Sequence, residues 1–323
     1  MELIAIDSNP IPDGASCFSL VPEKGVTLRV ATWVAKGAAK GTVTLVQGRS
    51  EFIEKYFEVI EELRSRGFHV VAFDLRGQGG SSRLLKSQFK GHIRAFSEYK
   101  EDLRVVLEDV ALARFPGPHY LLGHSTGCSV ILDSAARLRT QVERVVLSSP
   151  LVEIKLPKWG RKPARWLARI MVACGLGAFY VPGGSSRLVE PFQGNKLTSD
   201  GPRYQRMVDI LTAKPELGVG SPTAGWFHRV SAALQRIRSV KFARQDGPPT
   251  LVVASGADRI VCKQASETLC RYSSWMAYLE VRGAQHELLM EQDKYRSQFW
   301  AAFDAFVPLD DAPPIMSRVE ETV

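Results

Sequence analysis

Residues 121–128 place a serine, Ser125, between two glycines in the order Gly-His-Ser-Thr-Gly, directly after an apolar run. The apolar run predicts a buried strand, and the residues that follow predict a helix. A serine at such a sharp strand-to-helix turn takes a strained backbone conformation. Gly123 and Gly127 flank it because larger side chains there would collide with the neighbouring strand and helix. The pattern therefore predicts a turn that lifts the Ser125 hydroxyl clear of a sheet.

Apolar runs of strand length alternate with longer segments of helical pattern along much of the chain. Strands are expected at residues 43–46, 69–74, 119–122, 144–148, 250–255 and 276–281. Helices are expected at residues 52–66, 96–113 and 126–136. Such helices are long enough to cross over between parallel strands, whereas residues 27–33 alternate like part of an antiparallel edge hairpin. The order predicts an α/β fold with a mostly parallel central sheet flanked by helices.

A serine hydroxyl is a poor nucleophile at neutral pH, so it needs a histidine that accepts its proton and an acid that orients the histidine. Asp258 follows the expected strand at 250–255, and His286 follows the expected strand at 276–281. Taken singly, Asp258 could be a turn residue and His286 an exposed loop residue. The order Ser, Asp, His, each just after a strand, favours a catalytic triad of Ser125, Asp258 and His286.

An acyl-transfer site also needs donors for the oxyanion that forms in the reaction. The backbone N–H of Thr126, next to the serine, is expected to be one donor. The second is assigned to the N–H of Arg49, in the loop after the strand at 43–46. Gly48 would let the backbone approach the substrate closely there, although an ordinary strand-to-helix turn is the alternative.

With these residues in place, the chain resembles the α/β-hydrolase superfamily, and within it the lysophospholipase L2 and monoacylglycerol lipase branch. The resemblance rests on the triad loops, on residues 47–56, 73–81 and 195–200, and on the Gly225-Trp226 pair. Many relatives carry histidine where this chain has Gln47, which leaves the backbone donor intact but no role for that side chain.

The resemblance implies an inserted helical cap and a serine hydrolase that cleaves carboxylic esters of lysophospholipids or monoacylglycerols through an acyl-enzyme, without a cofactor. A thioesterase, a small-molecule carboxylesterase or an acyltransferase on the same site is the nearer alternative, because fold alone does not decide the substrate. A non-catalytic ligand-binding protein is the more distant one. No metal site is expected, since the histidines are scattered without ligand spacing.

The strand-helix alternation breaks between about residues 151 and 240. This segment is expected to be the helical cap, inserted into a hydrolase core of residues 1–150 and 241–307, and residues 308–323 are expected to form a flexible tail. The segment holds 14 Lys and Arg residues against 5 Asp and Glu, while the whole chain has a net charge of +8. Positive charge concentrated over an active-site mouth would attract anionic substrates or an anionic membrane surface.

Within the expected cap, residues 155–174 interleave basic residues with tryptophans and aliphatic residues. They suit either a helix that lies at a membrane interface or a helix that docks on its own core with a solvated basic face. Trp226, Arg203 and Tyr204 are candidates for substrate contact, with ordinary packing as the alternative. Nucleic-acid binding is not expected, since no recognised binding motif accompanies the charge.

The remaining features concern the compartment. Five cysteines at irregular spacing, with no Cys-x-x-Cys pair, indicate reduced thiols. The first residues do not read as a secretory signal, and no window approaches the roughly 20 apolar residues that span a bilayer. We therefore expect a cytoplasmic protein, with peripheral membrane association left open. The sequence does not determine the oligomeric state.

Overall fold

The computed structural model describes residues 1–307, apart from the side chain of Lys158, and the expected tail at 308–323 lies outside the described residues. An eight-stranded sheet forms its centre, in the order β1-β2-β4-β3-β5-β6-β7-β8. In the described chain, β2 alone runs against its neighbours, and every other adjacent pair is parallel. The strands are β1 (Ser16–Glu23), β2 (Val26–Trp33), β3 (Gly41–Val46), β4 (Phe68–Phe73), β5 (His119–His124), β6 (Arg144–Ser148), β7 (Thr250–Ser255) and β8 (Met276–Val281).

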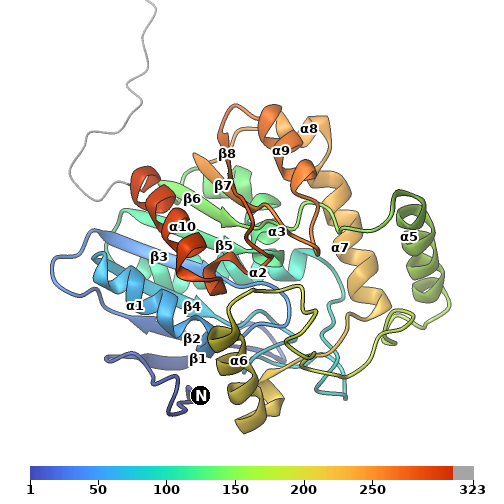
Figure 1. The fold of residues 1–323 in the computed structure, drawn as a ribbon, viewed down its shortest axis with the longest axis horizontal. Helices are drawn as coiled ribbons and strands as arrows, with labels where there is room; N and C mark the ends of the chain where they lie inside the picture. The colour runs from blue at the N-terminus through green and yellow to red at the C-terminus, as the bar shows by residue number, and fades with distance from the viewer. Residues whose placement is uncertain (308–323) are drawn as a thin grey trace, which may run out of the picture.

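Helices cover both faces of this sheet (Figure 1). The helices are α1 (Phe57–Ser65), α2 (Ser97–Val106), α3 (Thr126–Leu132), α4 (Ala135–Leu138), α5 (Lys158–Ala173), α6 (Gly201–Ala213), α7 (Ala224–Ile237), α8 (Val240–Ala243), α9 (Lys263–Arg271) and α10 (Asp293–Phe306). Short helical turns are η1 (Ile53–Tyr56), the π-helical η2 (Leu107–Leu112), η3 (Pro215–Leu217) and η4 (Leu288–Met290).

The inner strands are buried on both faces, which is why they appear in the sequence as continuous apolar runs. Successive residues of β4 point to opposite sides of the sheet. Val70 and Ala72 belong to the core packed beneath α1 and α10, whereas Val71 and Phe73 belong to the core beneath α2, α3 and α9. The sheet is therefore the middle of three layers, and its loops are held by cores on both sides.

The observed strands agree with the expected strands where the apolar runs in the sequence are clearest. The strands expected at 144–148, 250–255 and 276–281 have the same bounds in the structure. The helix expected at 126–136 is interrupted, because α3 ends at Leu132 and α4 begins only at Ala135. Asp133 and Ser134 form the interruption, and both residue types favour turns over helix interiors.

Three longer helices connect β6 to β7. Helix α7 packs on core residues, and α5 packs on α7 at the side away from the sheet (Figure 1). Helix α6 packs separately through Tyr204, Met207 and Ile210 on Phe52, just before η1. We propose that this segment, residues 151–240, is the cap expected from the sequence.

The turn between β5 and α3 lies very close to the end of β3. A side chain at Gly127 would overlap the backbone carbonyl groups of Val46 and Gln47. Backbone atoms cannot move aside as the end of a flexible side chain can. Glycine at this position therefore sets how closely α3 approaches β3.

We predict that Gly127→Ala lowers the free energy of unfolding by about 3 kcal/mol, because the new methyl group must displace backbone at the sheet edge. Urea denaturation measures this change. Gly160→Ala is the matched control, since Gly160 lies in helix α5 with nothing within 4 Å of an added Cβ. The control should raise stability slightly, by about 0.5–1 kcal/mol. Equal stability of the Gly127→Ala variant and the unmodified protein would contradict this packing argument.

Candidate active site

Ser125 occupies the turn between β5 and α3 in a strained backbone conformation. Its φ of 48° and ψ of −112° lie in a region that non-glycine residues rarely adopt. The turn is held by a hydrogen bond of 3.1 Å from the Ser125 N–H to the carbonyl of Ser148, at the end of the neighbouring strand β6. Strain of this kind persists only where the surrounding structure fixes the backbone, as it does here.

The structure brings the three expected residues together at the carboxyl ends of the strands. The Ser125 Oγ lies 3.0 Å from the His286 Nε2, and the His286 Nδ1 lies 2.7 Å from the Asp258 Oδ2. All three side chains are buried. This geometry allows His286 to take the serine proton on one ring nitrogen while the other donates to Asp258.

Asp258 is positioned by its own loop as well as by the histidine. Its Oδ1 accepts hydrogen bonds from the N–H groups of Ile260, at 2.7 Å, and Val261, at 2.9 Å. Burial acts to raise the pKa of Asp258, but the hydrogen bond from His286 and these two backbone N–H groups lower it below its ordinary value. The carboxylate therefore stays charged, as an acid that orients an imidazole must.

The two amides expected to hold an oxyanion both belong to residues that line the cavity above Ser125. Among the described residues, the backbone N–H groups of Arg49 and Thr126 donate no hydrogen bond. Glycine at position 48 also suits the packing of the loop, because a Cβ there would meet the Glu51 carboxylate and the His124 ring.

The loop that carries Arg49 is fixed by Gln78, from the turn after β4. The Gln78 amide donates to the carbonyls of Gly48, at 2.7 Å, and Glu51, at 3.0 Å, and it accepts from the Ser50 N–H at 3.2 Å. Ser50 has a positive φ of 63°, so its conformation needs such support. Sequence reasoning missed Gln78, although it lies in the 73–81 stretch that carried the family resemblance.

A buried ion cluster of Glu51, Lys55 and Glu287 lies behind this loop. The Glu51 carboxylate accepts from the Gly48 N–H at 2.5 Å and from the Tyr56 hydroxyl at 2.7 Å, and it pairs with the Lys55 Nζ at 2.9 Å. Lys55 also pairs with Glu287, the residue after His286. Sequence reasoning missed this cluster, since only the spacing of Glu51 and Lys55 on one turn hinted at it.

The charges in this cluster are fixed by their mutual contacts. Burial acts to raise the pKa of Glu51, but Lys55 and the hydrogen bonds from Lys55 and Tyr56 lower it to about 2. Burial acts to lower the pKa of Lys55, whereas Glu287 and Glu51 raise it above its ordinary value. Burial also lowers the pKa of His124 to about 4, so this ring, whose centre lies 5.0 Å from the centre of the His286 ring, is neutral at pH 7.

A cavity of about 730 Å³ opens above the Ser125 hydroxyl. Much of its wall is apolar, which suits a ligand with a hydrocarbon part. The apolar lining residues are Leu151, Ile154, Leu188, Val189, Leu197, Met207, Leu211, Phe227 and Ile260, and Tyr204 and Trp226 also line the cavity.

The three residues expected to contact substrate have different positions. Trp226 and Tyr204 line the cavity, but Arg203 does not. Arg203 instead ties α6 to the core through Glu58, at 2.6 Å, and through Asp293, at 2.7 Å. We correct that expectation, because a guanidinium engaged by these carboxylates outside the cavity has a structural role.

Arg49 also contributes its side chain to the cavity wall. Its guanidinium donates to the Ser50 hydroxyl at 2.8 Å and to the Gly220 carbonyl, and it lies 5.1 Å from the centre of the Trp226 ring. Burial lowers its pKa to about 10, which still leaves it charged at pH 7. Within the described residues it has no carboxylate partner. Arg49 therefore places a positive charge in the wall of a cavity that the carboxylates of Glu51, Glu190 and Glu287 also line.

Comparison with solved structures identifies the fold. A soluble variant of monoglyceride lipase from Saccharomyces cerevisiae superposes with a TM-score of 0.71 at 16% identity, covering 92% of this chain and 96% of that one. The monoacylglycerol lipase of Paleococcus ferrophilus gives a TM-score of 0.67 at 23% identity, covering 88% and 99%. The predicted fold is confirmed, because the chain has the α/β-hydrolase fold.

The family follows from the sequence comparison. The family model described as serine aminopeptidase, S33, matches residues 37–293, and the chain belongs to this family of hydrolases. It is 29% identical to lysophospholipase L2 of Escherichia coli K12 over 269 residues, covering 79% of this chain and 76% of the relative. It is 28% identical to the probable lysophospholipase L2 of Haemophilus influenzae over 274 residues, covering 84% and 85%. The resemblance to this branch is therefore confirmed.

We predict that Glu51→Gln lowers kcat for a short p-nitrophenyl ester about tenfold or more, with a smaller change in KM. The substitution removes the charge that holds the Gly48 amide and Lys55, so the loop that carries Arg49, the expected oxyanion donor, loses its fixed position. Because the pKa of Glu51 is about 2, the unmodified protein should keep this support from pH 5 upward. Glu61→Gln, which weakens the ion pairs of Glu61 with Lys36 and Arg64 away from the cavity, should leave kcat unchanged. An unaltered kcat in a folded Glu51→Gln variant would refute the positioning role.

Proposed function

We propose that the protein hydrolyses the acyl ester of lysophospholipids or monoacylglycerols, with Ser125 as nucleophile, His286 as general base and Asp258 as the acid that orients the histidine. The observation that carries this proposal is the Ser125–His286 hydrogen bond of 3.0 Å at the base of a cavity with mostly apolar side walls. The protein is a carboxylic ester hydrolase, and the names of its relatives support a lipid ester as the substrate.

The proposed reaction proceeds in two halves. The Ser125 Oγ attacks the ester carbonyl while its proton passes to the His286 Nε2, and the oxyanion accepts hydrogen bonds from the Arg49 and Thr126 amides. Collapse of this intermediate breaks the ester C–O bond, and His286 returns the proton to the leaving glycerol oxygen. Water then attacks the acyl-enzyme with His286 again as base, which releases the fatty acid and restores Ser125.

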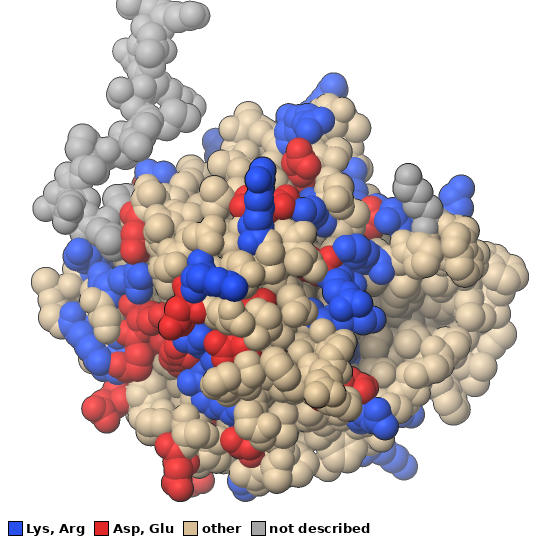
Figure 2. Space-filling view, viewed as in Figure 1, with Lys and Arg blue, Asp and Glu red and all other residues tan. Residues whose placement is uncertain are grey.

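We also propose that α5 is where the protein contacts a membrane surface. The helix presents Trp159, 84% exposed, and Trp166, 67% exposed, to solvent together with Lys162 and Arg169, whereas Arg161 and Arg165 are partly buried. A helix docked on its own core would hide its tryptophans and expose its arginines. In Figure 2 the lobe that carries α5 has a largely uncharged surface, with Lys and Arg side chains at its border with the body. Tryptophan beside positive charge is the combination that favours an anionic lipid interface.

No helix in residues 1–307 combines the length and apolar character that a membrane crossing requires.

The substrate proposal predicts fatty-acid release from lysophosphatidylcholine, lysophosphatidylglycerol and monoacylglycerol at rates well above those for an acyl-CoA and a short p-nitrophenyl ester. Ser125→Ala and His286→Ala should each lower turnover by about 10³-fold or more, and the double variant should lose little further, because the groups act as a unit. Fatty-acid titration measures all of these rates. Activity confined to acyl-CoA would indicate a thioesterase, and activity confined to the short ester a small-molecule esterase. Full activity in either single variant would refute the assignment of the residues.

The membrane proposal predicts stronger binding to vesicles with anionic lipid than to neutral vesicles, and weaker binding as salt is raised. Replacing Trp159 and Trp166 together by alanine should lower the affinity for anionic vesicles about tenfold or more, as measured by co-sedimentation. Tyr272→Ala is the control, since Tyr272 is a similarly exposed aromatic residue, 63% exposed, at the end of α9. Equal binding to both vesicle types at low salt would exclude this contact.

A further inference from the structure

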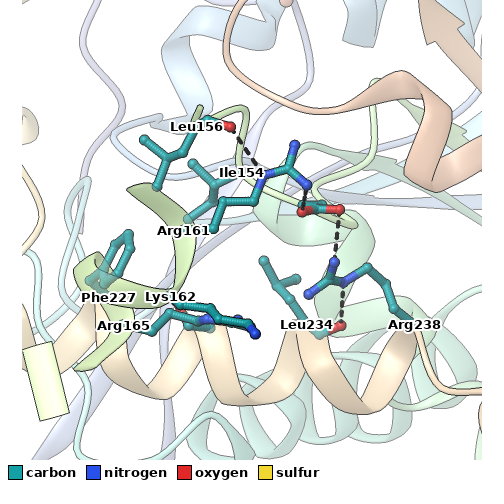
Figure 3. Close-up of a pocket in the computed structure, with 10 residues that line it drawn as sticks. Ile154, Leu156, Arg161, Lys162, Arg165, Phe227, Leu234 and Arg238 are labelled. Carbon is teal, nitrogen blue, oxygen red and sulfur yellow. Dashed lines mark hydrogen bonds and ion pairs between the residues drawn. The ribbon is translucent and has the colours of Figure 1, made fainter. Parts of the chain in front are cut away.

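A second, smaller cavity lies between α5 and α7, with a volume of about 240 Å³ (Figure 3). Four basic side chains line it, and one carboxylate, Glu153, accompanies them. The basic side chains are Arg161, Lys162, Arg165 and Arg238. The lining is therefore strongly cationic, with three positive charges in excess.

The four cations differ in how they are held. Arg161 and Arg238 both pair with the Glu153 carboxylate, the latter at 2.7 Å, and each also donates to a backbone carbonyl. Figure 3 shows these two arginines approaching the Glu153 carboxylate from different sides, while Lys162 and Arg165 carry no dashed line. Within residues 1–307, Lys162 and Arg165 make no ion pair and no side-chain hydrogen bond. Glu153 thus fixes two of the cations and leaves the other two available for a ligand.

This cavity adjoins the cavity above Ser125. Ile154 and Phe227 line both of them, so the two spaces share a wall. A lysophospholipid carries its phosphate only a few covalent bonds from the ester carbonyl. A substrate whose carbonyl lies at Ser125 and whose head group lies against Ile154 and Phe227 would bring its phosphate next to the second cavity.

Resting on the proposed function, we propose that the cationic cavity is the subsite for the phosphate group of a lysophospholipid substrate, with Arg165 and Lys162 as the residues that bind it. Arginine and lysine are the side chains that bind phosphate best, arginine through two parallel N–H donors. The Ser231 hydroxyl, which also lines the cavity, is a further donor. The subsite makes the enzyme prefer phosphate-bearing lipids over monoacylglycerol.

The remaining lining residues distinguish a phosphate ester from free phosphate. Apolar side chains of Ile154, Leu156, Phe227 and Leu234 form part of the cavity. Inorganic phosphate would leave these surfaces without a partner, whereas the glycerol carbons of a lysophospholipid cover them. A ligand that is anionic at one end and hydrocarbon at the other matches both parts of the lining.

The test compares kcat/KM for lysophosphatidylglycerol and for monoacylglycerol with the same acyl chain, both in phosphate-free detergent micelles. Arg165→Ala and Lys162→Ala should each lower the ratio of the two values about 10- to 100-fold, the loss expected for a charge-assisted hydrogen bond to phosphate. Arg169→Ala is the matched control, because it removes the same charge one turn further along α5 from a residue that does not line the cavity. The control should leave the ratio unchanged.

A competition arm separates the two sources of phosphate. Glycerol 3-phosphate should inhibit hydrolysis of lysophosphatidylglycerol more strongly than inorganic phosphate does, and Arg165→Ala should weaken that inhibition. Equal inhibition by inorganic phosphate, or a substrate ratio unchanged by Arg165→Ala and Lys162→Ala, would overturn the subsite while leaving the proposed function standing. An unmodified protein that hydrolyses neither lipid would overturn the proposed function, and the subsite with it.

Discussion

The site depends on the close packing of α3 against the end of β3, which the absence of a side chain at Gly127 permits. That contact places the strained turn of Ser125 beside the loop that follows β3. The Thr126 amide and the Arg49 amide consequently belong to two segments held next to each other by the sheet. Catalysis of acyl transfer needs donors that are already in place when the oxyanion forms. The parallel strands supply that rigidity, because cores on both faces fix their carboxyl ends.

A cluster of buried charged side chains supports the loops that carry the candidate catalytic residues. Glu51 holds the loop that carries Arg49 through the Gly48 amide, and Lys55 links Glu51 to Glu287, beside His286. A buried carboxylate without partners would be neutral or destabilising. The Glu51 carboxylate is instead paired with Lys55 and hydrogen-bonded. In front of the serine, the Arg49 side chain adds positive charge to the cavity wall. The cationic cavity between α5 and α7 extends the same sign of charge toward the outer helix.

Much of the fold and of the candidate site could be predicted from the sequence. The parts that sequence reasoning missed have one physical cause in common. Buried parallel strands are continuous apolar runs, so residues 144–148 and 250–255 were predicted with their observed bounds. Gln78 escaped notice because its contacts join segments about 30 residues apart without a local pattern. The cluster around Glu51 escaped notice because Lys55 and Glu287 are 232 residues apart. The role of Arg203 was misjudged, since its partner Glu58 lies 145 residues away. For α5, the amphipathic pattern defined two faces but not which of them packs on α7.

The central claim is that Ser125 is the nucleophile of an acyl-ester hydrolase. Labelling the folded protein with a fluorophosphonate, followed by intact mass measurement and peptide mapping, tests it directly, because the reagent bonds covalently to activated serines. The account predicts one adduct per chain, on the peptide that contains Ser125, and none in the Ser125→Ala variant. An unlabelled folded protein, or an adduct that persists in Ser125→Ala, would contradict the account.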